Sequence, residues 1–387
     1  MSSIYMDYAA TTPVDPRVVA VMLPYFNNNF GNPSSVHIFG QQAEAALEDA
    51  RLSVSQGLNC LPREVVFTSC GTESDNLALR GAAFAALKQG KANHILISPV
   101  EHHAVLHTAR QLASLHGFEV EYLPVNEYGA VHPDQVSQRI RPDTAIVSVM
   151  QANNEIGTIN PIAEIGAICR EKNIPFHTDS VQAAAYLPVD VQALHVDLLS
   201  IGAHKFYGPK GVGALYIRSG IQLEPAQTGG AQESGLRAGT QNIPYIAGLA
   251  EAFRLVCSER EARTAHLIPL RDRLIGQVLE EIPQARLTGH PDRRLPNHAS
   301  FVFKGVDGNA LLTMLDMAGF ACSSGSACKT GNPEPSEVLL ALGLSREWAL
   351  GSLRVTLGTA TTPEHIEAFT RALPGIVERA RALVSPV

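Results

Sequence analysis

The sequence has few cysteines, the residues that stabilise small secreted proteins through disulfide bonds, and it has no long apolar run. It contains one tryptophan and six cysteines among 387 residues, and no two cysteines form a C-x-x-C pair. A chain of this length does not need disulfide bonds, so we expect reduced thiols and a cytoplasmic location. No apolar run approaches the about 20 residues that cross a bilayer, and we expect neither a signal peptide nor a membrane anchor.

Charge is also scarce in this chain. Charged residues make up 17% of it, and acidic residues outnumber basic ones by 37 to 30, which gives a formal net charge of −7. Nucleic-acid-binding proteins carry a basic face, so this balance argues against nucleic acid as a direct partner. The apolar fraction of 45% is ample for buried cores, and the length corresponds to two or three domains of roughly 150 residues each.

Two common nucleotide-binding motifs are missing. No G-x-x-x-x-G-K-[ST] segment occurs, and no G-x-G-x-x-G segment follows an expected strand. These absences argue against a nucleotide P-loop and against a Rossmann dinucleotide site.

The middle of the chain alternates between short β-rich runs and helical stretches. A helix is expected at residues 36–58, and strands are expected at 64–69, 94–98, 118–123, 144–150, 174–179, 196–202 and 212–217. Several of these runs are almost continuous in Val, Ile and Leu, as in strands that are buried on both faces. The alternation therefore predicts an α/β domain with a mostly parallel sheet, which we place at residues 14–255.

The character of the sequence changes after about residue 250. A long helical stretch at 267–281 and strands at 299–303 and 353–356 flank a Gly- and Ser-rich loop at 323–333. We expect a smaller α+β domain that consists of residues 256–387 and recruits the N-terminal arm, residues 1–13.

Polar residues follow five of the expected strands, where ligands bind in open parallel sheets. They are Gly71 with Thr72, His102, Asn154, Asp179, and His204 with Lys205. Loops are polar in any case, so each of these taken alone is weak evidence for a site.

The segment that begins at Gly71 has two interpretations. A helix expected from Glu73 to Lys88 follows directly after a strand, and the free N–H groups at its start would bind an anion with help from the Thr72 hydroxyl. Alternatively, Thr72 and Asp75 form a capping box without any ligand.

Asp179 and Lys205 stand at the ends of neighbouring expected strands. A lysine amine titrates near about 10.4 and becomes useful as a Schiff base with an aldehyde cofactor. Pyridoxal phosphate also needs a carboxylate at its ring nitrogen, so the two residues match that cofactor. The alternative is that Asp179 caps a helix and Lys205 is a surface lysine, with Lys210 as a nearby second candidate.

Nine segments, in order along the chain, resemble the NifS/IscS-type cysteine desulfurases, which belong to the class V aminotransferase group of fold-type-I pyridoxal-phosphate enzymes. The segments are YMDYAATTP (5–13), NPSSVH (32–37), TSCGTESDN (68–76), EH (101–102), NNEIG (153–157), HTDSVQ (177–182), HKFYGPKG (204–211), RAGT (237–240) and SSGSAC (323–328). The resemblance covers nearly the whole chain and implies the same fold and activity.

The resemblance implies a role for individual residues around the cofactor ring. Lys205 corresponds to the Schiff-base lysine, Asp179 to the partner of the ring nitrogen, and His102 to the histidine that stacks on the ring. Gln182 corresponds to the ligand of the phenolic oxygen. Asn154 corresponds to an asparagine near both cofactor and substrate.

Further residues match positions that bind the phosphate and the substrate. The phosphate positions are Gly71, Thr72, Gly202 and His204. Thr240 corresponds to a threonine that reaches the phosphate of the other subunit, which implies a homodimer. Arg354 corresponds to the arginine that grips the substrate carboxylate, a task that suits a planar guanidinium. Gly202 stands where many relatives carry serine, and glycine lacks the hydroxyl that would donate to the phosphate.

Cys328 distinguishes a desulfurase from an ordinary aminotransferase. The resemblance implies that Cys328 takes sulfur from L-cysteine, leaves L-alanine, and passes its persulfide to an acceptor such as an iron–sulfur scaffold protein. A free thiol is only partly ionised at neutral pH, so His102 or Lys329 would have to activate it. Cys322 is expected to pack instead. We expect no resident metal ion, with Cys328 at most a transient contact of an iron–sulfur cluster.

Three alternatives remain open. A selenocysteine lyase or another class V aminotransferase would use the same cofactor. A metal-binding protein would use Glu101 with His102, His103 and His107, although no H-E-x-x-H motif is present. A non-catalytic scaffold is disfavoured by the presence of Lys205, Asp179 and Cys328.

Overall fold

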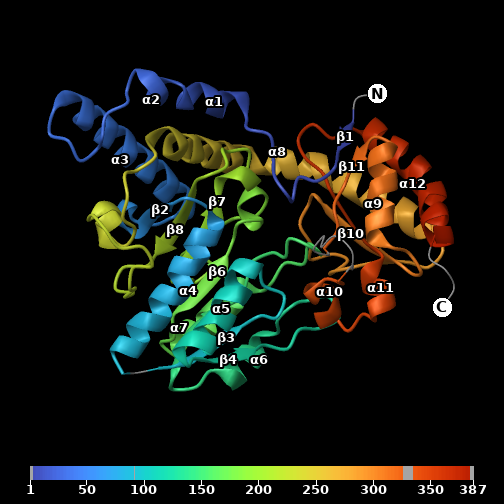
Figure 1. The fold of residues 1–387 in the computed structure, drawn as a ribbon, viewed down its shortest axis with the longest axis horizontal. Helices are drawn as coiled ribbons and strands as arrows, with labels where there is room; N and C mark the ends of the chain where they lie inside the picture. Colours follow the sequence, from blue (N-terminus) through green and yellow to red (C-terminus); the bar gives the residue numbers. More distant parts are fainter. Residues whose placement is uncertain (1–2, 91, 326–333, 384–387) are drawn as a thin grey trace.

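The computed structural model describes residues 3–90, 92–325 and 334–383. The largest sheet has seven strands. Figure 1 shows it flanked by helices on one side of the molecule, with a smaller sheet and the C-terminal helices on the other. Cys328 and Lys329, on which the sequence-based prediction of sulfur transfer depends, lie outside the described residues.

The large sheet confirms the predicted mostly parallel α/β architecture. Its strands lie in the order β2 (Val65–Thr68), β8 (Gly213–Ile217), β7 (Leu198–Gly202), β6 (Phe176–Asp179), β5 (Thr144–Ser148), β3 (His94–Ile97) and β4 (Glu119–Tyr122). Only β8 runs against its neighbours, since it pairs antiparallel with both β2 and β7. Each expected strand of this sheet is present, with ends that differ by at most two residues.

Both faces of this sheet are covered, as the continuous apolar runs predict. In β3, Ile95 and Ile97 pack with helices α4 (Gly71–Lys88) and α5 (His103–His116), whereas Leu96 faces the opposite core. That second core also receives α3 (Ile38–Leu58) and α8 (Ile243–Glu281). Helices α6 (Pro133–Arg139) and α7 (Ile162–Glu171) complete the layers.

The smaller sheet is antiparallel. It consists of β12 (Ser352–Thr356), β10 (His298–Phe303) and β9 (Ala285–Leu287). Helices α9 (Gly308–Met317), α10 (Glu337–Ala341), α11 (Arg346–Leu350) and α12 (Pro363–Leu383) surround it. The expected recruitment of the N-terminal arm is present, because β1 (Ile4–Tyr5) pairs with β11 (Phe320–Ala321).

Helix α8 is far longer than the helix expected at 267–281. It begins at Ile243 and passes Pro269 without a break. Proline is typical of a first helical turn and rare inside a helix, so the sequence does not indicate that a helix continues through this position. The division that we propose after residue 255 therefore falls inside a helix that packs against α3 at one end and α12 at the other.

Helices α1 (Pro16–Met22) and α2 (Pro24–Asn27) connect the arm to α3 along the upper edge of the molecule (Figure 1). None of the helices in the described ranges is long and apolar enough to span a bilayer.

Candidate active site

A cavity of about 250 Å³ lies at the carboxyl ends of the central strands. Nine of the residues predicted from the sequence line it: Gly71, Thr72, His102, Asn154, Asp179, Gln182, His204, Lys205 and Arg354. They come from separate parts of the chain, so the parallel sheet brings together side chains that the sequence keeps apart.

The start of α4 forms one wall of the cavity. The capping-box prediction for Thr72 and Asp75 is wrong, because the N-cap residue is Cys70 and no side chain caps the helix. The N–H groups of the first turn have no partner inside the helix and lie beside the cavity. A Cβ on Gly71 would approach Val181 Cγ2 to 2.6 Å, so this wall requires glycine.

Lys205 lies on a short 3₁₀ turn directly after β7. Its Nζ donates hydrogen bonds to the carbonyl oxygens of Ala9 and Ala10, at 2.6 and 2.8 Å. Burial and the nearby Arg354 guanidinium lower the pKa of the Lys205 amine to about 8. Lys210 is exposed and does not line the cavity, so the geometry favours Lys205 as the reactive amine.

Asp179 ends β6 on the cavity floor, and its Oδ1 accepts a hydrogen bond from Val181 N at 2.8 Å. Burial raises the pKa of Asp179, and the charges of His102 and Lys205 partly oppose that rise. A protonated ring nitrogen placed against this carboxylate would also lower its pKa, because a nearby positive charge and a hydrogen-bond donor stabilise the ionised form. The predicted alternative of Asp179 as a helix cap is not supported, since no helix begins at Ser180.

His102 caps α5 and faces the same cavity. Its Nδ1 accepts a hydrogen bond from Ala104 N at 3.1 Å, so the neutral ring carries its proton on Nε2. Burial lowers the pKa of His102, which favours that neutral ring.

Arg354 projects from β12 and joins the small sheet to the cavity. Its Nη2 donates to Asp7 Oδ1 at 2.9 Å and its Nη1 donates to the Asn154 carbonyl at 3.0 Å. Its Nε is buried and has no hydrogen-bond partner among the described residues. This guanidinium is therefore fixed in place with one donor still open.

Gln182 and His204 tie the N-terminal arm over the cavity. Gln182 Nε2 donates to the Ala9 carbonyl at 2.8 Å, and His204 Nδ1 lies 3.2 Å from the Thr11 hydroxyl in a hydrogen bond. Burial lowers the pKa of His204 to about 4.

Three of the residues predicted from the sequence are not among the described residues that line the cavity. Gly202 is buried at the end of β7, behind the start of α4. Thr240 is exposed and does not line the cavity, which fits its predicted action on another subunit but does not test it. Cys328 lies outside the described residues. Cys322 packs against the main core, as expected.

Sequence reasoning missed several parts of the cavity. Asp75 is 2% exposed, lines the cavity, and its Oδ1 has no hydrogen-bond partner in the described ranges. The sequence signal that could have revealed Asp75 is its place among the apolar residues of the buried face of α4. Cys70, which the sequence favours as a small apolar filler over a reactive thiol, lines the cavity as the N-cap residue of α4. The backbone of Ala9 and Ala10 was missed because carbonyl groups are common to all residues.

Asp75, His102 and Asp179 also have the spacing of a metal-binding group, with ligand atoms within 4.8 Å of one another. Metal ligation requires ionised carboxylates. Burial raises the pKa of both Asp75 and Asp179, which favours their protonated forms. The metal alternative predicted from the sequence shares only His102 with this group. Its other two histidines, His103 and His107, stack against each other on the surface of α5.

Comparison with known proteins places this arrangement in a family. Residues 4–369 match the family described as Aminotransferase class-V. Cysteine desulfurase IscS of Methanosarcina thermophila is 49% identical over 98% of this chain and 93% of its own length. The chain belongs to the cysteine desulfurases of the class V aminotransferase family.

Solved structures of the family agree with this fold. A NifS-like protein superposes with a TM-score of 0.90 at 36% identity, covering 97% of this chain and 100% of that one. SspA, solved in complex with cysteine, has a TM-score of 0.80 at 36% identity and covers 92% of this chain and 99% of that one. This desulfurase therefore has the fold-type-I architecture that the sequence predicts.

Proposed function

We propose that this desulfurase removes sulfur from L-cysteine with pyridoxal 5'-phosphate and leaves L-alanine and a persulfide on Cys328. The observation that carries the proposal is the presence of Lys205, Asp179 and Arg354 in one cavity. The Lys205 amine, with its lowered pKa, matches the aldehyde of the cofactor, and the buried Asp179 carboxyl matches the ring nitrogen. The fixed Arg354 guanidinium matches the carboxylate of the substrate.

The cavity fits pyridoxal phosphate on its own chemistry. The open N–H groups of α4 and the Thr72 hydroxyl would hold the phosphate, and Asp179 would hold the proton on the ring nitrogen. When bound, the cofactor supplies an aldehyde for the substrate amine and a ring that accepts the electrons released at Cα. Asp75 Oδ1, which accepts no hydrogen bond among the described residues and lies 3.6 Å from His177 Nε2, offers one further buried polar atom on the cavity wall.

Arg354 is the residue that we assign to the substrate carboxylate. Asp7 and the Asn154 carbonyl already hold two of its nitrogens, so the guanidinium is oriented before a substrate arrives. A planar guanidinium suits a carboxylate better than an ammonium does. SspA was solved in complex with cysteine, which supports cysteine as the substrate here.

We assign to Lys205 the removal of the proton from the substrate Cα. Its lowered pKa leaves a useful share of the amine neutral near pH 8, so it can accept that proton. The carbonyl oxygens of Ala9 and Ala10 then hold the protonated amine close to Cα.

Cys328 is assigned to sulfur transfer by its sequence motif. Its thiolate attacks the substrate sulfur, so an S–S bond forms while the substrate C–S bond breaks. Ser324 and Gly325, in the first half of this motif, line a small pocket together with His102 and Arg354, which also line the cofactor cavity.

His102 is assigned to ring stacking and to proton transfer at the mouth of the cavity. Its Nδ1 already accepts the Ala104 N–H, so His102 would have to give up that bond to accept the thiol proton of Cys328. The neutral ring with its proton on Nε2 is better suited to donate.

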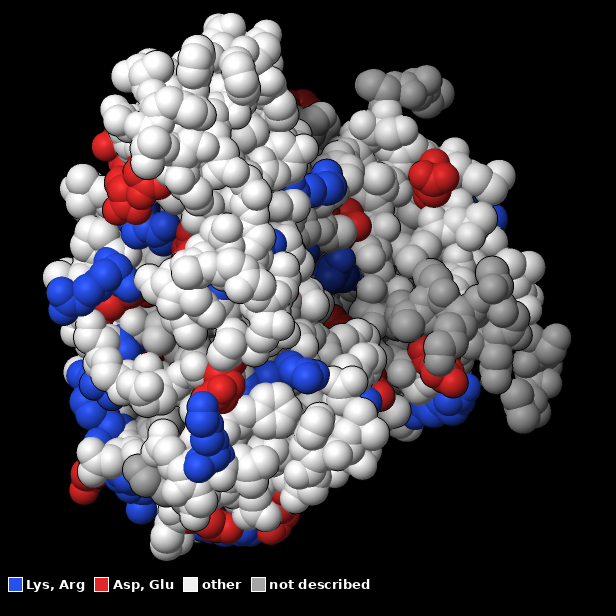
Figure 2. Space-filling view, turned by 60° about the vertical axis from the view of Figure 1, so that its left-hand side comes forward, with Lys and Arg blue, Asp and Glu red and all other residues white. Residues whose placement is uncertain are grey.

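The partner that we assign to this subunit is a second copy. No Lys, Arg, Asp or Glu occurs from residue 18 to residue 43, and Phe26, Phe30 and Val36 are exposed in this stretch. Figure 2, which brings this edge forward, shows few charged side chains across its upper part. Exposed apolar areas of this kind mark protein interfaces, which supports the homodimer implied by Thr240.

The sulfur acceptor that we propose is an iron–sulfur scaffold protein, because the curated relatives carry the name IscS. The five cysteines within the described ranges are all free thiols, which supports a reducing compartment such as the cytoplasm.

The deciding experiment is the visible spectrum of the purified protein. The cofactor band should be present, change on addition of L-cysteine, and return as alanine accumulates. The Lys205→Ala variant should lose the band of the covalently attached cofactor, whereas the Lys210→Ala variant should keep it. A band that persists unchanged in Lys205→Ala refutes the assignment of the lysine.

A further inference from the structure

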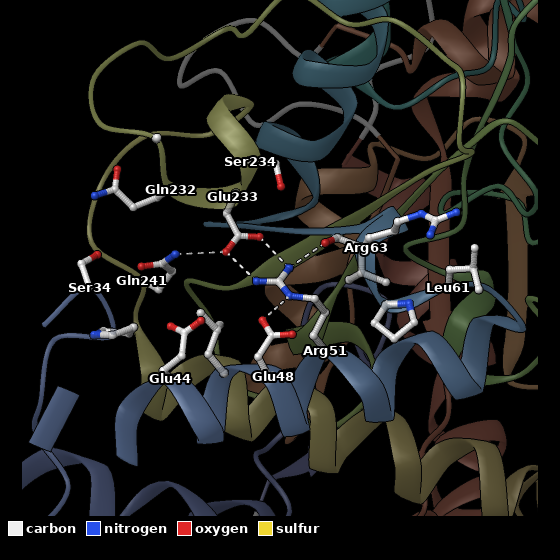
Figure 3. A pocket seen from close by; sticks show the side chains of 15 residues that line it. Ser34, Glu44, Glu48, Arg51, Leu61, Arg63, Gln232, Glu233, Ser234 and Gln241 are labelled. Atoms are coloured by element: carbon white, nitrogen blue, oxygen red, sulfur yellow. Dashed lines mark hydrogen bonds and ion pairs between the residues drawn. The ribbon is translucent and has the colours of Figure 1, made fainter. Parts of the chain in front are cut away.

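A second cavity, of about 770 Å³, lies between helix α3 and residues 231–241, which we call the strap. The strap carries Thr240 at its far end and runs above α3 in Figure 3. Because open space separates much of the strap from the helix, its position depends on the few side chains that cross the gap.

One ion pair crosses that gap. Glu233 projects down from the strap and meets Arg51 of α3 in two parallel hydrogen bonds of 2.8 and 3.0 Å (Figure 3). The Glu233 side chain is 1% exposed and that of Arg51 is 12% exposed. A paired, bidentate contact removed from water is far more directional than a surface ion pair.

Further hydrogen bonds fix the two charged groups. Glu233 Oε2 also accepts from Phe67 N at 2.9 Å, and Oε1 accepts from Gln241 Nε2 at 3.3 Å. Arg51 Nη1 also donates to the Val65 carbonyl at 2.7 Å, and the guanidinium lies 5.0 Å from the centre of the Phe67 ring. One carboxylate therefore connects the strap to α3, to β2 and to the residue that follows Thr240.

The backbone at this point is held in an unusual conformation. Glu233 has φ 46° and Ser234 has φ 56°, a left-handed region that residues with a Cβ seldom occupy. Such a conformation persists where surrounding contacts impose it, and the ion pair to Arg51 is the charged contact that Glu233 makes alongside its hydrogen bonds to Phe67 N and Gln241.

The strap also reaches the first turn of α4. Arg237 Nε donates to Glu73 Oε1 at 2.8 Å, and Glu73 Oε2 accepts from Ser69 N at 2.6 Å. The same helix start provides the wall assigned to the phosphate. The strap is thus tied to the proposed phosphate site of its own subunit, while its exposed Thr240 does not line the cavity of that subunit.

We infer that the Arg51–Glu233 ion pair positions the strap so that Thr240 reaches the cofactor site of the partner subunit. This inference rests on the proposed function and on the proposed dimer. Glu233 and Arg51 are positioning residues, since neither lines the cofactor cavity. Breaking the pair in one subunit therefore weakens cofactor binding in the other.

Heterodimers with two different affinity tags test this directly. In the first, one subunit carries Glu233→Gln and the other carries Lys205→Ala, so the single lysine-bearing site faces an intact strap. In the second, one subunit carries both substitutions and the other is wild type, so the single lysine-bearing site faces the altered strap. Because both heterodimers contain the same two substitutions, any general loss of stability should be the same in both.

The readout is the cofactor dissociation constant from the visible band of the covalently attached cofactor, to which only the subunit with Lys205 contributes. The second heterodimer should bind the cofactor roughly ten-fold more weakly than the first, the loss expected when one partner of a buried hydrogen-bonded pair is removed. Equal constants, or weaker binding in the first heterodimer, overturn the inference.

Two controls separate this result from failure of the proposed function. The Glu119→Gln variant breaks an ion pair with Arg141 whose carboxylate side chain is 59% exposed, and it should leave the constant unchanged in either arrangement. A wild-type protein that shows no cofactor band refutes the proposed function before any heterodimer is made. A wild-type protein that binds the cofactor as a monomer refutes the inference and the proposed dimer, and leaves the proposed reaction standing.

Discussion

Ser323 and Arg354 exchange two backbone hydrogen bonds, of 3.2 and 2.7 Å, so the start of the Cys328 segment is paired with the strand that carries the proposed substrate arginine. The side chain of Arg354 leaves the same strand toward Asp7 and Asn154. The first residue of the Cys328 motif is therefore joined directly to the strand that carries the proposed substrate arginine.

This relationship predicts the effect of Arg354→Lys. The substitution keeps the charge but loses the planar fork, so the KM for L-cysteine should rise roughly ten-fold or more while the cofactor band stays intact. Steady-state alanine formation measures it, with the exposed Arg293→Lys as the control. An unchanged KM would show that another group binds the carboxylate.

The lowered pKa of Lys205 predicts a pH dependence of cofactor capture. The neutral amine is the nucleophile, and its fraction rises as the pH passes the value of about 8 given by burial and by Arg354. The rate at which the cofactor-free protein gains its visible band should therefore increase between about pH 7 and pH 9 and then level off. A rate that is flat over this window contradicts the assignment.

Gly202 predicts a gain of function toward the cofactor. Its backbone is extended, with φ −137°, and a Cβ there would lie 3.4 Å from Gly71 N, an ordinary contact. A hydroxyl at this position would stand beside the proposed phosphate wall. Gly202→Ser should lower the cofactor dissociation constant by about three- to ten-fold, the worth of one hydrogen bond, whereas Gly202→Ala should not.

Glu155 predicts a pH dependence of stability. Burial raises the pKa of this carboxyl to about 7, although Ser336 donates a hydrogen bond to it. Between about pH 4.5 and 7 the folded chain binds more protons at this group than the unfolded chain, so its contribution to stability falls as the pH rises. Thermal unfolding should show that Glu155→Gln stabilises the protein at pH 8 relative to wild type, by about 1–3 kcal/mol, and not at pH 4.

An equal difference between the two proteins at both pH values would contradict this reading of Glu155. The Glu127→Gln substitution on the surface is the matched control, and it should leave the pH profile unchanged.

The sequence allowed the large sheet to be predicted because its strands are short, apolar and separated by helices. The antiparallel direction of β8 could not be predicted, since a buried strand carries the same residues in either direction. The extent of α8 was missed for a related reason, because Pro269 is compatible with both a helix start and a continuing helix.

The candidate site was predicted from residues that end strands and from family motifs, and nine of them line one cavity. Asp75 was missed because its spacing from Thr72 also fits a helix cap, and only burial distinguishes the two. The backbone of Ala9 and Ala10 could not be found, since carbonyl groups are common to all residues. Glu233 could not be found either, because its partner lies far away in the sequence, on α3.

The central claim is that the thiol of residue 328 receives the sulfur that this protein removes from L-cysteine. Cys328→Ser should keep the cofactor band and its response to L-cysteine yet form no alanine and no protein-bound persulfide, whereas Cys322→Ser should form both. Alanine formation by Cys328→Ser at the wild-type rate would contradict the account.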